Sequence, residues 1–275
     1  MFTKAIVRPP CARFTEGLTT IDAGAPDYAR ALKQHAAYCE ALEHSGLTLT
    51  RLDADERYPD STFVEDTAVI IGAPPIAALP VGGRPSDQTS VSGAILTRPG
   101  APSRVGEVNG VAEVLSQFYP ELHSIRAPGT LDGGDVCEAE EHFYIGISQR
   151  TNETGAQQLA KVLAGYDYTS SFIDIRNVKN ILHLKSGLAY LGVNRLAVIE
   201  SLANHDEFRH YDLVRVGTTE RYAANCVRLN EYVLVAAGFP VFENALQDLG
   251  YKTLSVEMTE FQKMDGGLSC LSLRF

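Results

Sequence analysis

Short apolar runs alternate with stretches of helical periodicity along this chain of 275 residues. Four runs of strand length predict β-strands at 4–8, 47–52, 62–71 and 94–97. Four stretches with apolar positions at helical spacing predict helices at 26–44, 106–118, 152–163 and 241–249. Pro26 is a favourable first residue for the longest helix, and Gly46 ends it. The alternation of strands and helices predicts an α/β fold.

Five segments resemble one another, because in each a short polar or reactive patch leads into an apolar strand. The segments are 63–69, 131–136, 182–188, 222–227 and 268–273. In the middle three, a turn and a second apolar strand follow, at 143–146, 195–199 and 232–236. We call their central residues the marker residues: Asp66, Asp132, His183, Asn225 and Cys270. Their loose spacing of 42 to 66 residues predicts stacked or radial repeats of one unit.

A radial arrangement would bring the marker residues to one place. If the units surround an axis, equivalent ends of the hairpins converge there, and residues distant in sequence meet in a central site. The widest interval between markers contains a segment rich in Pro, Gly and Ser, residues 73–92, which reads as an extended surface loop. Patterned strand resumes directly after it, and no shift in composition divides the chain. We therefore expect residues 1–275 to form a single domain.

The composition is that of a soluble globular protein, with 45% hydrophobic and 21% charged residues. The formal net charge of −10 disfavours binding to nucleic acid or to an anionic membrane. It is compatible with a cationic small-molecule substrate, although acidity that merely keeps a protein soluble is the commoner case. No apolar run is long enough to cross a bilayer, and no signal-peptide pattern opens the chain, so the expected location is the cytoplasm.

The five cysteines include no Cys-x-x-Cys pair, and their odd number argues against a disulfide framework or a structural zinc site. Each is expected to be a free and mostly buried thiol. Cys270 differs from the others in its surroundings, because Gly266 and Gly267 permit tight backbone geometry and Ser269 is small. A nucleophilic cysteine also needs a base, and the base needs a group that orients it.

His183 is the candidate base among seven histidines, because it alone lies inside an apolar strand pattern. The other six lie among polar residues and are expected to be exposed: His35, His44, His123, His142, His205 and His210. A single histidine of this kind is more often a hydrogen-bonded core residue than a catalytic one. Its marker position favours the catalytic interpretation.

Two groups of carboxylates accompany these residues. Asp132 and Asp135 are flanked by glycines, as turn residues commonly are. Asp60, Glu65 and Asp66 form a second acidic cluster, and carboxylates among apolar residues suit a buried cationic ligand. If residues 62–71 form a strand, the side chains of Glu65 and Asp66 point to opposite faces, so at most one enters a shared pocket unless a bulge intervenes.

Six motifs give the chain a resemblance to the dimethylarginine dimethylaminohydrolases, a family of guanidine-modifying enzymes with the five-bladed β/α-propeller (pentein) fold. The motifs are, in order, Phe63-Val-Glu-Asp, Thr97-Arg-Pro-Gly-Ala-Pro-Ser-Arg, Ala127-Pro-Gly-Thr-Leu-Asp-Gly-Gly-Asp-Val, Leu182-His-Leu-Lys-Ser-Gly-Leu, Tyr222-Ala-Ala-Asn-Cys and Met264-Asp-Gly-Gly-Leu-Ser-Cys. The resemblance covers nearly the whole chain. It implies a propeller with pseudo-fivefold repeats around a central active site.

The resemblance implies a role for each residue at a matching position. Cys270 would be the nucleophile, His183 the proton donor and acceptor, and Asp132 the carboxylate that orients His183. The residues implied to contact the substrate are Asp60, Glu65 and Asp66 at the guanidinium, Arg104 and Arg150 at the α-carboxylate, Leu18 in a lid, and the Met264 carbonyl at the α-ammonium. The implied reaction needs neither a metal nor an organic cofactor, and it converts Nω-methylated arginine to citrulline through a covalent thiouronium adduct.

The chain departs from the family pattern in two ways. The segment at 73–92 is longer than the family's hairpin, and Val105 follows Arg104 where members often carry a second basic residue. The nearest alternatives within the superfamily are an arginine deiminase, which usually has an extra helical domain, and an agmatine deiminase, which lacks the carboxylate clamp. Two alternatives come from other functional classes. One is a non-catalytic propeller that binds other macromolecules, and the other is a thiol-redox protein. Base rates and the resemblance favour a homodimer.

Overall fold

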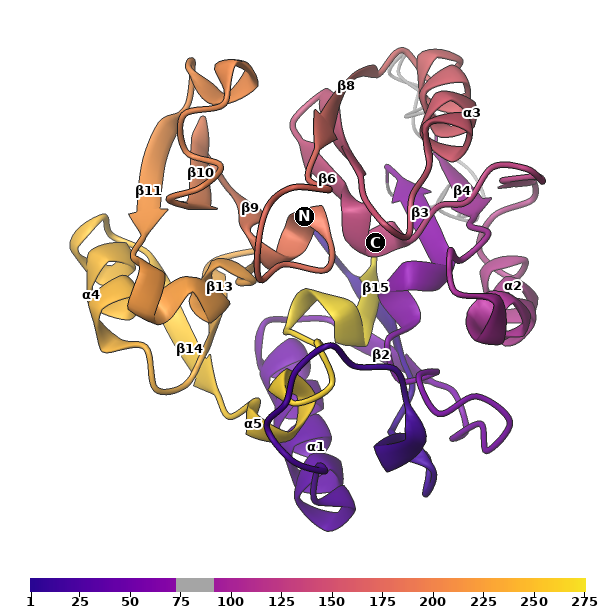
Figure 1. The fold of residues 1–275 in the computed structure, drawn as a ribbon, viewed down its shortest axis with the longest axis horizontal. Coiled ribbons are helices and arrows are strands. Elements are labelled where there is room, and N and C mark those ends of the chain that lie inside the picture. The colour runs from indigo at the N-terminus through magenta and orange to yellow at the C-terminus, as the bar shows by residue number, and fades with distance from the viewer. Residues whose placement is uncertain (73–91) are drawn as a thin grey trace, which may run out of the picture.

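The computed structural model describes residues 1–72 and 92–275. The predicted surface loop at 73–92 therefore lies, apart from its last residue, outside the described residues. In the described ranges the chain folds into three-stranded sheets arranged around one axis, and there are five of them (Figure 1). The mixed α/β fold with five repeated units confirms the predicted propeller.

Every sheet is built in the same way, because its middle strand pairs antiparallel with one neighbour and parallel with the other. We number the sheets as units one to five. Unit one consists of β15 (Ser272–Arg274), β1 (Lys4–Val7) and β2 (Thr48–Arg51), and unit two of β3 (Ala68–Ile71), β4 (Gly93–Leu96) and β5 (Leu122–Ser124). Unit three consists of β6 (Val136–Ala139), β7 (His142–Ile147) and β8 (Thr169–Asp174), and unit four of β9 (Leu188–Gly192), β10 (Arg195–Ile199) and β11 (Asp212–Val216). Unit five consists of β12 (Val227–Leu229), β13 (Tyr232–Ala236) and β14 (Lys252–Val256).

The parallel pair in each unit requires a crossover connection, which the helices supply. The crossovers are α1 (Tyr28–His44) in unit one, α2 (Val108–Leu115) in unit two, α3 (Glu153–Ala164) in unit three and α4 (Pro240–Asp248) in unit five. Unit four uses a single 3-10 turn, Asp206–Phe208, in place of a helix, and the short α5 (Thr259–Gln262) follows unit five. In Figure 1 the helices lie at the outside of the ring.

The first and last strands of the chain close the ring. β15 pairs antiparallel with β1, so that Ile6 faces Leu273 in the register, and Leu273 is buried. The backbone N–H groups of Thr3 and Lys4 also donate to the carbonyl of Phe275. Unit one is thus assembled from both ends of the chain.

The predicted long helix begins two residues later than Pro26, because Asp27 caps it. The Asp27 side chain accepts a hydrogen bond of 2.9 Å from the Arg30 backbone N–H, which satisfies one of the free donors in the first turn. The helix ends at His44, just before Gly46, which has a φ of +92°. The start and stop residues were therefore correct to within one turn.

The predicted strand at 62–71 is wrong in its first half. Residues Val64–Thr67 form a 3-10 turn, and β3 begins only at Ala68. The Thr67 hydroxyl donates to the Val64 carbonyl at 2.6 Å, which closes the turn on itself. Because the turn replaces an alternating strand, the side chains of Glu65 and Asp66 are not sent to opposite faces of a sheet, and both are buried.

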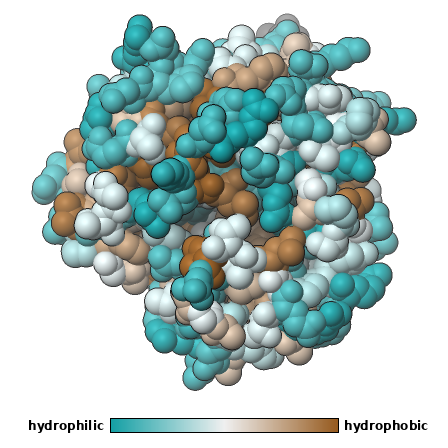
Figure 2. Space-filling model, in the orientation of Figure 1, coloured by the Kyte–Doolittle hydropathy of each residue, from teal (hydrophilic) through white to brown (hydrophobic). Residues whose placement is uncertain are grey.

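A 3-10 turn of this kind precedes the first strand of every unit. We call these five segments the inner turns: η8 (Ser269–Leu271), η2 (Val64–Thr67), η4 (Gly133–Asp135), η5 (Leu184–Ser186) and η7 (Thr218–Ala224). The marker residues lie in them or directly beside them, and the turns contact one another in sequence from η8 through η2, η4 and η5 to η7. Figure 2 shows the result from outside: apolar side chains line a hollow in the middle of this face, with polar side chains around it.

No helix within residues 1–72 and 92–275 has the length and apolar character that a membrane crossing requires. All five cysteines are free and buried, as the sequence predicted. Of the six histidines expected to be exposed, His44 and His210 are exposed, His123, His142 and His205 are half-buried, and His35 is buried. His35 lies on the buried face of α1, where its Nδ1 is 3.7 Å from the Cys39 sulfur, because the helical period points it toward the core.

Candidate active site

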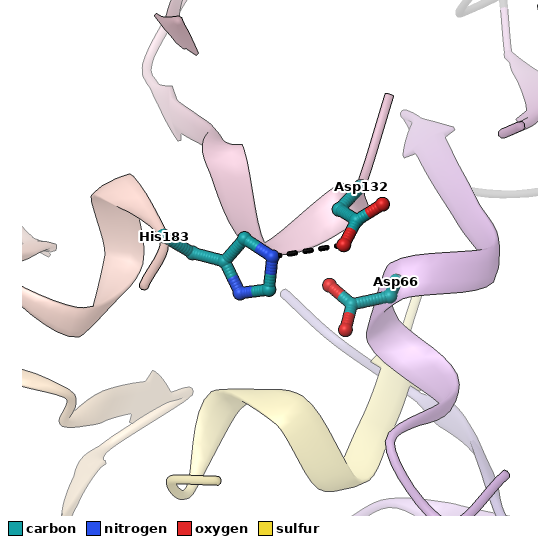
Figure 3. Close-up of side chains that lie close together, drawn as sticks. All are labelled: Asp66, Asp132 and His183. Atoms are coloured by element: carbon teal, nitrogen blue, oxygen red, sulfur yellow. Dashed lines mark hydrogen bonds and ion pairs between the residues drawn. The ribbon is translucent and has the colours of Figure 1, made fainter. Parts of the chain in front are cut away.

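Asp132 and His183 form a buried pair where two inner turns meet (Figure 3). His183 precedes η5, Asp132 precedes η4, and His183 Nε2 lies 2.9 Å from Asp132 Oδ2. The other carboxylate oxygen of Asp132 accepts a hydrogen bond of 2.8 Å from the Gly100 backbone N–H. An ionised carboxylate can only accept, so Nε2 carries a proton, and the second ring nitrogen points away from Asp132. The structure brings together the two residues that the sequence analysis paired.

The charges around this pair hold His183 in its protonated form. Burial disfavours the charged imidazole and by itself would lower the pKa of His183. The carboxylates of Asp66, Asp135 and Asp132 outweigh burial and raise the pKa of His183 to about 9. Burial likewise acts to raise the pKa of Asp132, but its hydrogen bond to His183 holds the pKa of Asp132 below the ordinary range. At neutral pH the pair is an imidazolium–carboxylate ion pair.

Asp66 lies beside this pair and is held by Arg104. Arg104 Nη1 donates to Asp66 Oδ2 at 2.6 Å, and the Gly134 backbone N–H donates to Asp66 Oδ1 at 2.9 Å. Arg104 is itself bound through its Nε and Nη2 to both oxygens of Glu107, one helical turn later, and it is 4% exposed. The Arg104 guanidinium also donates to two backbone carbonyls. Most of its hydrogen-bonding capacity is thus used inside the protein.

Cys270 lies in inner turn η8, with its backbone N–H bonded to the Gly267 carbonyl at 3.2 Å. The thiol is 8% exposed. Burial raises the pKa of the Cys270 thiol to about 12, and the nearby carboxylates of Glu65 and Asp66 act in the same direction. Without a ligand, therefore, the sulfur is protonated at neutral pH.

One pocket joins these groups. Cys270, His183 and Asp66 all line it, and the enclosed space is about 20 Å³, which is room for about one water molecule. The remaining residues of its wall are Leu18, Asp60, Phe63, Arg104, Arg150, Leu182, Met264, Asp265 and Gly266. An acyclic amino acid of the size of arginine would enter only after part of this wall moves.

Leu18, in the loop at residues 17–20, forms an exposed part of that wall. Leu18 is 42% exposed, and its backbone N–H donates to both oxygens of Asp60, at 3.0 and 3.2 Å. The next residue, Thr19, bonds to the Lys263 carbonyl. Thr20 also bonds to the Asp265 carboxylate, so the loop is attached both to buried Asp60 and to residues 263 and 265. Burial raises the pKa of Asp60 above its ordinary value.

Glu65 is the one predicted substrate contact that does not line the pocket. Its Oε1 accepts from Lys185 at 2.7 Å and from Arg274 at 3.0 Å, and its Oε2 accepts from the Ser269 hydroxyl at 2.8 Å. Both oxygens are therefore engaged beneath the turn that carries Cys270. Contact between Glu65 and a substrate stays a prediction, and it would require one of these partners to be displaced.

Of the other predicted site residues, all except Asp132 line the pocket, and Asp132 lies behind His183. The sequence analysis missed Phe63, Leu182, Asp265 and Gly266 as wall residues. Each adjoins a residue that it named or belongs to the same motif, and that proximity was the only available signal. It also missed Glu107, which pairs with Arg104 three residues earlier; the predicted helix began only at residue 106, so it did not include Arg104.

Asp66, Asp132 and His183 also form the kind of group that could hold a metal ion, because their ligand atoms lie within 4.8 Å of one another. The carboxylate oxygens of Asp66 and Asp132 and His183 Nε2 already have hydrogen-bond partners, however. Asp132 faces the N–H of His183, and Asp66 faces the Arg104 guanidinium, so donors rather than a cation balance both carboxylates. The donor set fits an organic cation approaching from the pocket better than a bound metal.

Comparisons with known proteins show the family to which the chain belongs. The chain is 40% identical over 276 residues to the N(G),N(G)-dimethylarginine dimethylaminohydrolase of Pseudomonas aeruginosa, and the match covers 100% of both chains. Two solved structures match with a TM-score of 0.89 and 39% identity over 100% of both chains. One is a cysteine-to-serine mutant of the P. aeruginosa enzyme with citrulline, and the other is a histidine-to-glycine variant as an adduct with S-methyl-L-thiocitrulline. No family model matches the chain.

Proposed function

This chain belongs to the dimethylarginine dimethylaminohydrolase family, and from that premise we propose that it hydrolyses Nω-methylated arginine to citrulline with Cys270 as its nucleophile. The protein is then a hydrolase of linear amidines, which releases dimethylamine from asymmetric dimethylarginine and methylamine from monomethylarginine. One observation carries the assignment of residues. A single pocket presents a thiol, an imidazolium and a carboxylate, on Cys270, His183 and Asp66.

The substrate lies in the pocket with its guanidinium toward the acidic side. Asp66 and Asp60 receive its N–H groups, because charge-assisted hydrogen bonds repay the desolvation of buried carboxylates. Arg150 binds the α-carboxylate together with Arg104, and the Met264 carbonyl accepts from the α-ammonium. Arg150 is the freer of the two arginines, since its guanidinium forms no hydrogen bond with any residue in the two described ranges.

The first half of the reaction exchanges nitrogen for sulfur on the guanidinium carbon. Cys270 loses its proton to solvent, and the thiolate forms a C–S bond to that carbon. His183 passes the proton of its free ring nitrogen to the dimethylamino nitrogen, and the C–N bond breaks. Dimethylamine leaves and takes up the solvent proton. A positively charged thiouronium adduct remains on Cys270, and His183 is left neutral.

The second half returns both residues to their starting state. Neutral His183 takes one proton from water, and the resulting hydroxide adds to the same carbon. The C–S bond then breaks, the sulfur takes the second proton of the water, and citrulline departs. Asp132 keeps Nε2 protonated throughout, so that only the nitrogen facing the pocket exchanges protons.

The bound substrate itself favours the thiolate. A cation next to Cys270 opposes the effect of the two nearby carboxylates and lowers the pKa of the thiol from its value of about 12. Thiolate absorbance measured against pH, with and without an unreactive guanidinium analogue, tests this step. We expect the analogue to move the titration to lower pH, and an unchanged titration would exclude activation by the substrate.

The decisive assay measures citrulline from asymmetric dimethylarginine with the wild type and with Cys270→Ser. The variant is expected to lose at least about 10³-fold in kcat, because a hydroxyl is a far weaker nucleophile than a thiolate. Full activity in the variant would refute the covalent mechanism. Arginine and agmatine in the same assay test the deiminase alternatives, and a preference for either of these unmethylated substrates would overturn the substrate assignment.

The remaining expectations concern the setting of the enzyme. We propose that residues 1–275 form one catalytic domain, because the pocket draws on inner turns from units that span the chain. The five free cysteines support a reducing compartment such as the cytoplasm. A homodimer is proposed on base rates and on the family resemblance, and sedimentation or light scattering tests it.

A further inference from the structure

Asn225 is the one marker residue that the reaction described above does not use. Its side chain is buried, at 5% exposure, and lies directly after inner turn η7. Asn225 does not line the pocket, so it does not touch the substrate. A buried amide with three hydrogen bonds nevertheless needs an explanation.

The three hydrogen bonds reach both neighbouring units. Asn225 Nδ2 donates to the Lys185 carbonyl at 2.9 Å and to the Ser269 hydroxyl at 3.1 Å. Asn225 Oδ1 accepts from the Ser269 backbone N–H at 2.9 Å. The orientation of the amide is fixed by these partners, because a carbonyl can only accept and a backbone N–H can only donate.

These partners are next to the two reacting residues. Lys185 is in the inner turn that follows His183, and Ser269 directly precedes Cys270. Unit five, which carries Asn225, stands between unit four with His183 and unit one with Cys270. The Asn225 side chain thus connects the turn beside the proposed acid, His183, to the turn that carries the proposed nucleophile, Cys270. The fit is tight, since a Cβ on Gly267 would lie 2.6 Å from the Asn225 side chain.

Asn225 also completes a ring of hydrogen bonds around the axis. Each pair of neighbouring inner-turn regions is joined by a bond of 2.8 to 2.9 Å. The links are Asp66 to the Gly134 N–H, Asp132 to His183, Asn225 to the Lys185 carbonyl, Asn225 to the Ser269 N–H, and Ser269 to Glu65. Two of the five links depend on the side chain of Asn225 alone.

We propose that Asn225 is a positioning residue that sets the placement of His183 relative to Cys270, and this inference rests on the proposed function. Proton transfer to the departing amine and attack by sulfur must occur on the same carbon. A shift of about 1 Å between the two groups can cost about 10²-fold in rate. Loss of the amide releases the two turns from each other without removing any group that reacts.

The test uses Asn225→Asp with Asn230→Asp as its matched control. Asp at position 225 keeps the acceptor for the Ser269 N–H but loses both donors. Asn230, in the hairpin between β12 and β13 of the same unit, uses its amide in the same way. It accepts from the Phe2 N–H and donates to two backbone carbonyls, at 2.9 Å each. The control variant therefore also loses two amide hydrogen-bond donors, but at a site that does not line the pocket.

Two substrates with different leaving groups separate positioning from general damage. Dimethylamine must be protonated to leave, whereas S-methyl-L-thiocitrulline loses a thiolate that departs with little help from an acid. We expect Asn225→Asp to lower kcat about 10²-fold for dimethylarginine but only about tenfold for the thiocitrulline. A variant that is merely less folded loses the same factor on both.

The control and a second variant remove the remaining ambiguity. Asn230→Asp is expected to keep kcat on both substrates even where its Tm falls. Asn225→Ala, which adds no charge beside Cys270, should reproduce the unequal loss. Equal losses on the two substrates, an unchanged kcat, or an effect confined to the Asp variant would each overturn the proposal. Wild-type protein that releases no citrulline would instead refute the proposed function.

Discussion

At the scale of single residues, the most consequential feature is the proton that His183 holds. Its carboxylate neighbours raise the pKa of the imidazole to about 9, so the proposed general acid is protonated at neutral pH. The raised pKa also contributes to stability. That contribution to stability is complete below about pH 6.5, the pKa of a histidine in the unfolded chain. It is lost as the pH rises through about 9, the pKa of His183 in the folded protein.

Replacing Asp132 with Asn should therefore change the pH dependence of the reaction. The variant removes one of the charges that raise the pKa of His183, so the alkaline limb of kcat against pH moves to lower pH. We also expect kcat at neutral pH to fall by at least about 10²-fold, because the ring is no longer oriented. A pH–rate profile measures both. Asp174→Asn, at an exposed site, is the control, and an unmoved alkaline limb would contradict the role of Asp132.

Arg150 allows a second prediction at this scale. Arg150→Ala should raise KM for dimethylarginine by about 10- to 100-fold and alter kcat less, because the lost contact lies far from the reacting carbon. The matched measurement uses the same molecule without its carboxylate, dimethylagmatine. Its kcat/KM should be equal in variant and wild type. A loss on both substrates would mean that Arg150 serves the fold rather than the carboxylate.

Residue identities were the part of the site that the sequence predicted best. Cys270, His183 and Asp132 were candidates from their marker positions, and the family resemblance implied their roles. In the structure Cys270 and His183 line one pocket, and Asp132 lies behind His183. The environment of Glu65 was not predictable, because its partners Lys185, Arg274 and Ser269 come from units four and one. Contacts between units far apart in sequence leave no local pattern to read.

At the scale of elements, the inner turns determine the site. They interrupt each strand just before the sheet begins and turn the marker side chains toward the axis. The sequence indicated a polar patch at each position but assigned the one at 62–71 to a strand, because apolar neighbours surround it. A 3-10 turn of three or four residues is too short to show a periodicity of its own.

The packing of one inner turn on the next gives a prediction for stability. Gly133 opens η4, and a Cβ there would lie 2.0 Å from the Glu65 carbonyl oxygen. Gly133→Ala should lower the free energy of unfolding by about 1–3 kcal/mol, because rigid backbone must give way. Gly217→Ala is the control, since nothing lies within 4 Å of its Cβ. Urea unfolding compares the two, and equal midpoints would show that the turns are less tightly packed.

At the scale of the whole molecule, charge favours the approach of the substrate. The protein carries a formal net charge of −10, and methylated arginine carries a net charge of about +1 at neutral pH. Attraction of this kind is screened by salt.

We therefore expect kcat/KM to fall about two- to tenfold as ionic strength rises from 0.01 to 0.3 M. The steady-state kcat should stay constant over the same range and serves as the internal control. A kcat/KM that does not respond to salt would limit the role of the acidic surface to solubility.

At this scale repeat spacing predicted stacked or radial repeats, and the family resemblance implied a ring, but neither indicated how the ring closes. The first unit takes β1 and β2 from the N-terminal end of the chain and β15 from the C-terminal end, so its three strands do not follow one another in the sequence. A search for repeats finds four continuous units and a fifth that is split, and only the pairing of β15 with β1 makes it whole.

That split unit has a consequence for the order in which the enzyme becomes active during synthesis. A ribosome delivers the turns with Asp66, Asp132, His183 and Asn225 before it delivers Cys270. A nascent chain with these four turns assembled holds the acid and the carboxylates but no sulfur to attack with. The pairing of β15 with β1 completes the first sheet and brings in the turn that carries Cys270, the proposed nucleophile. We therefore expect the enzyme to become active only when its last strand has been added.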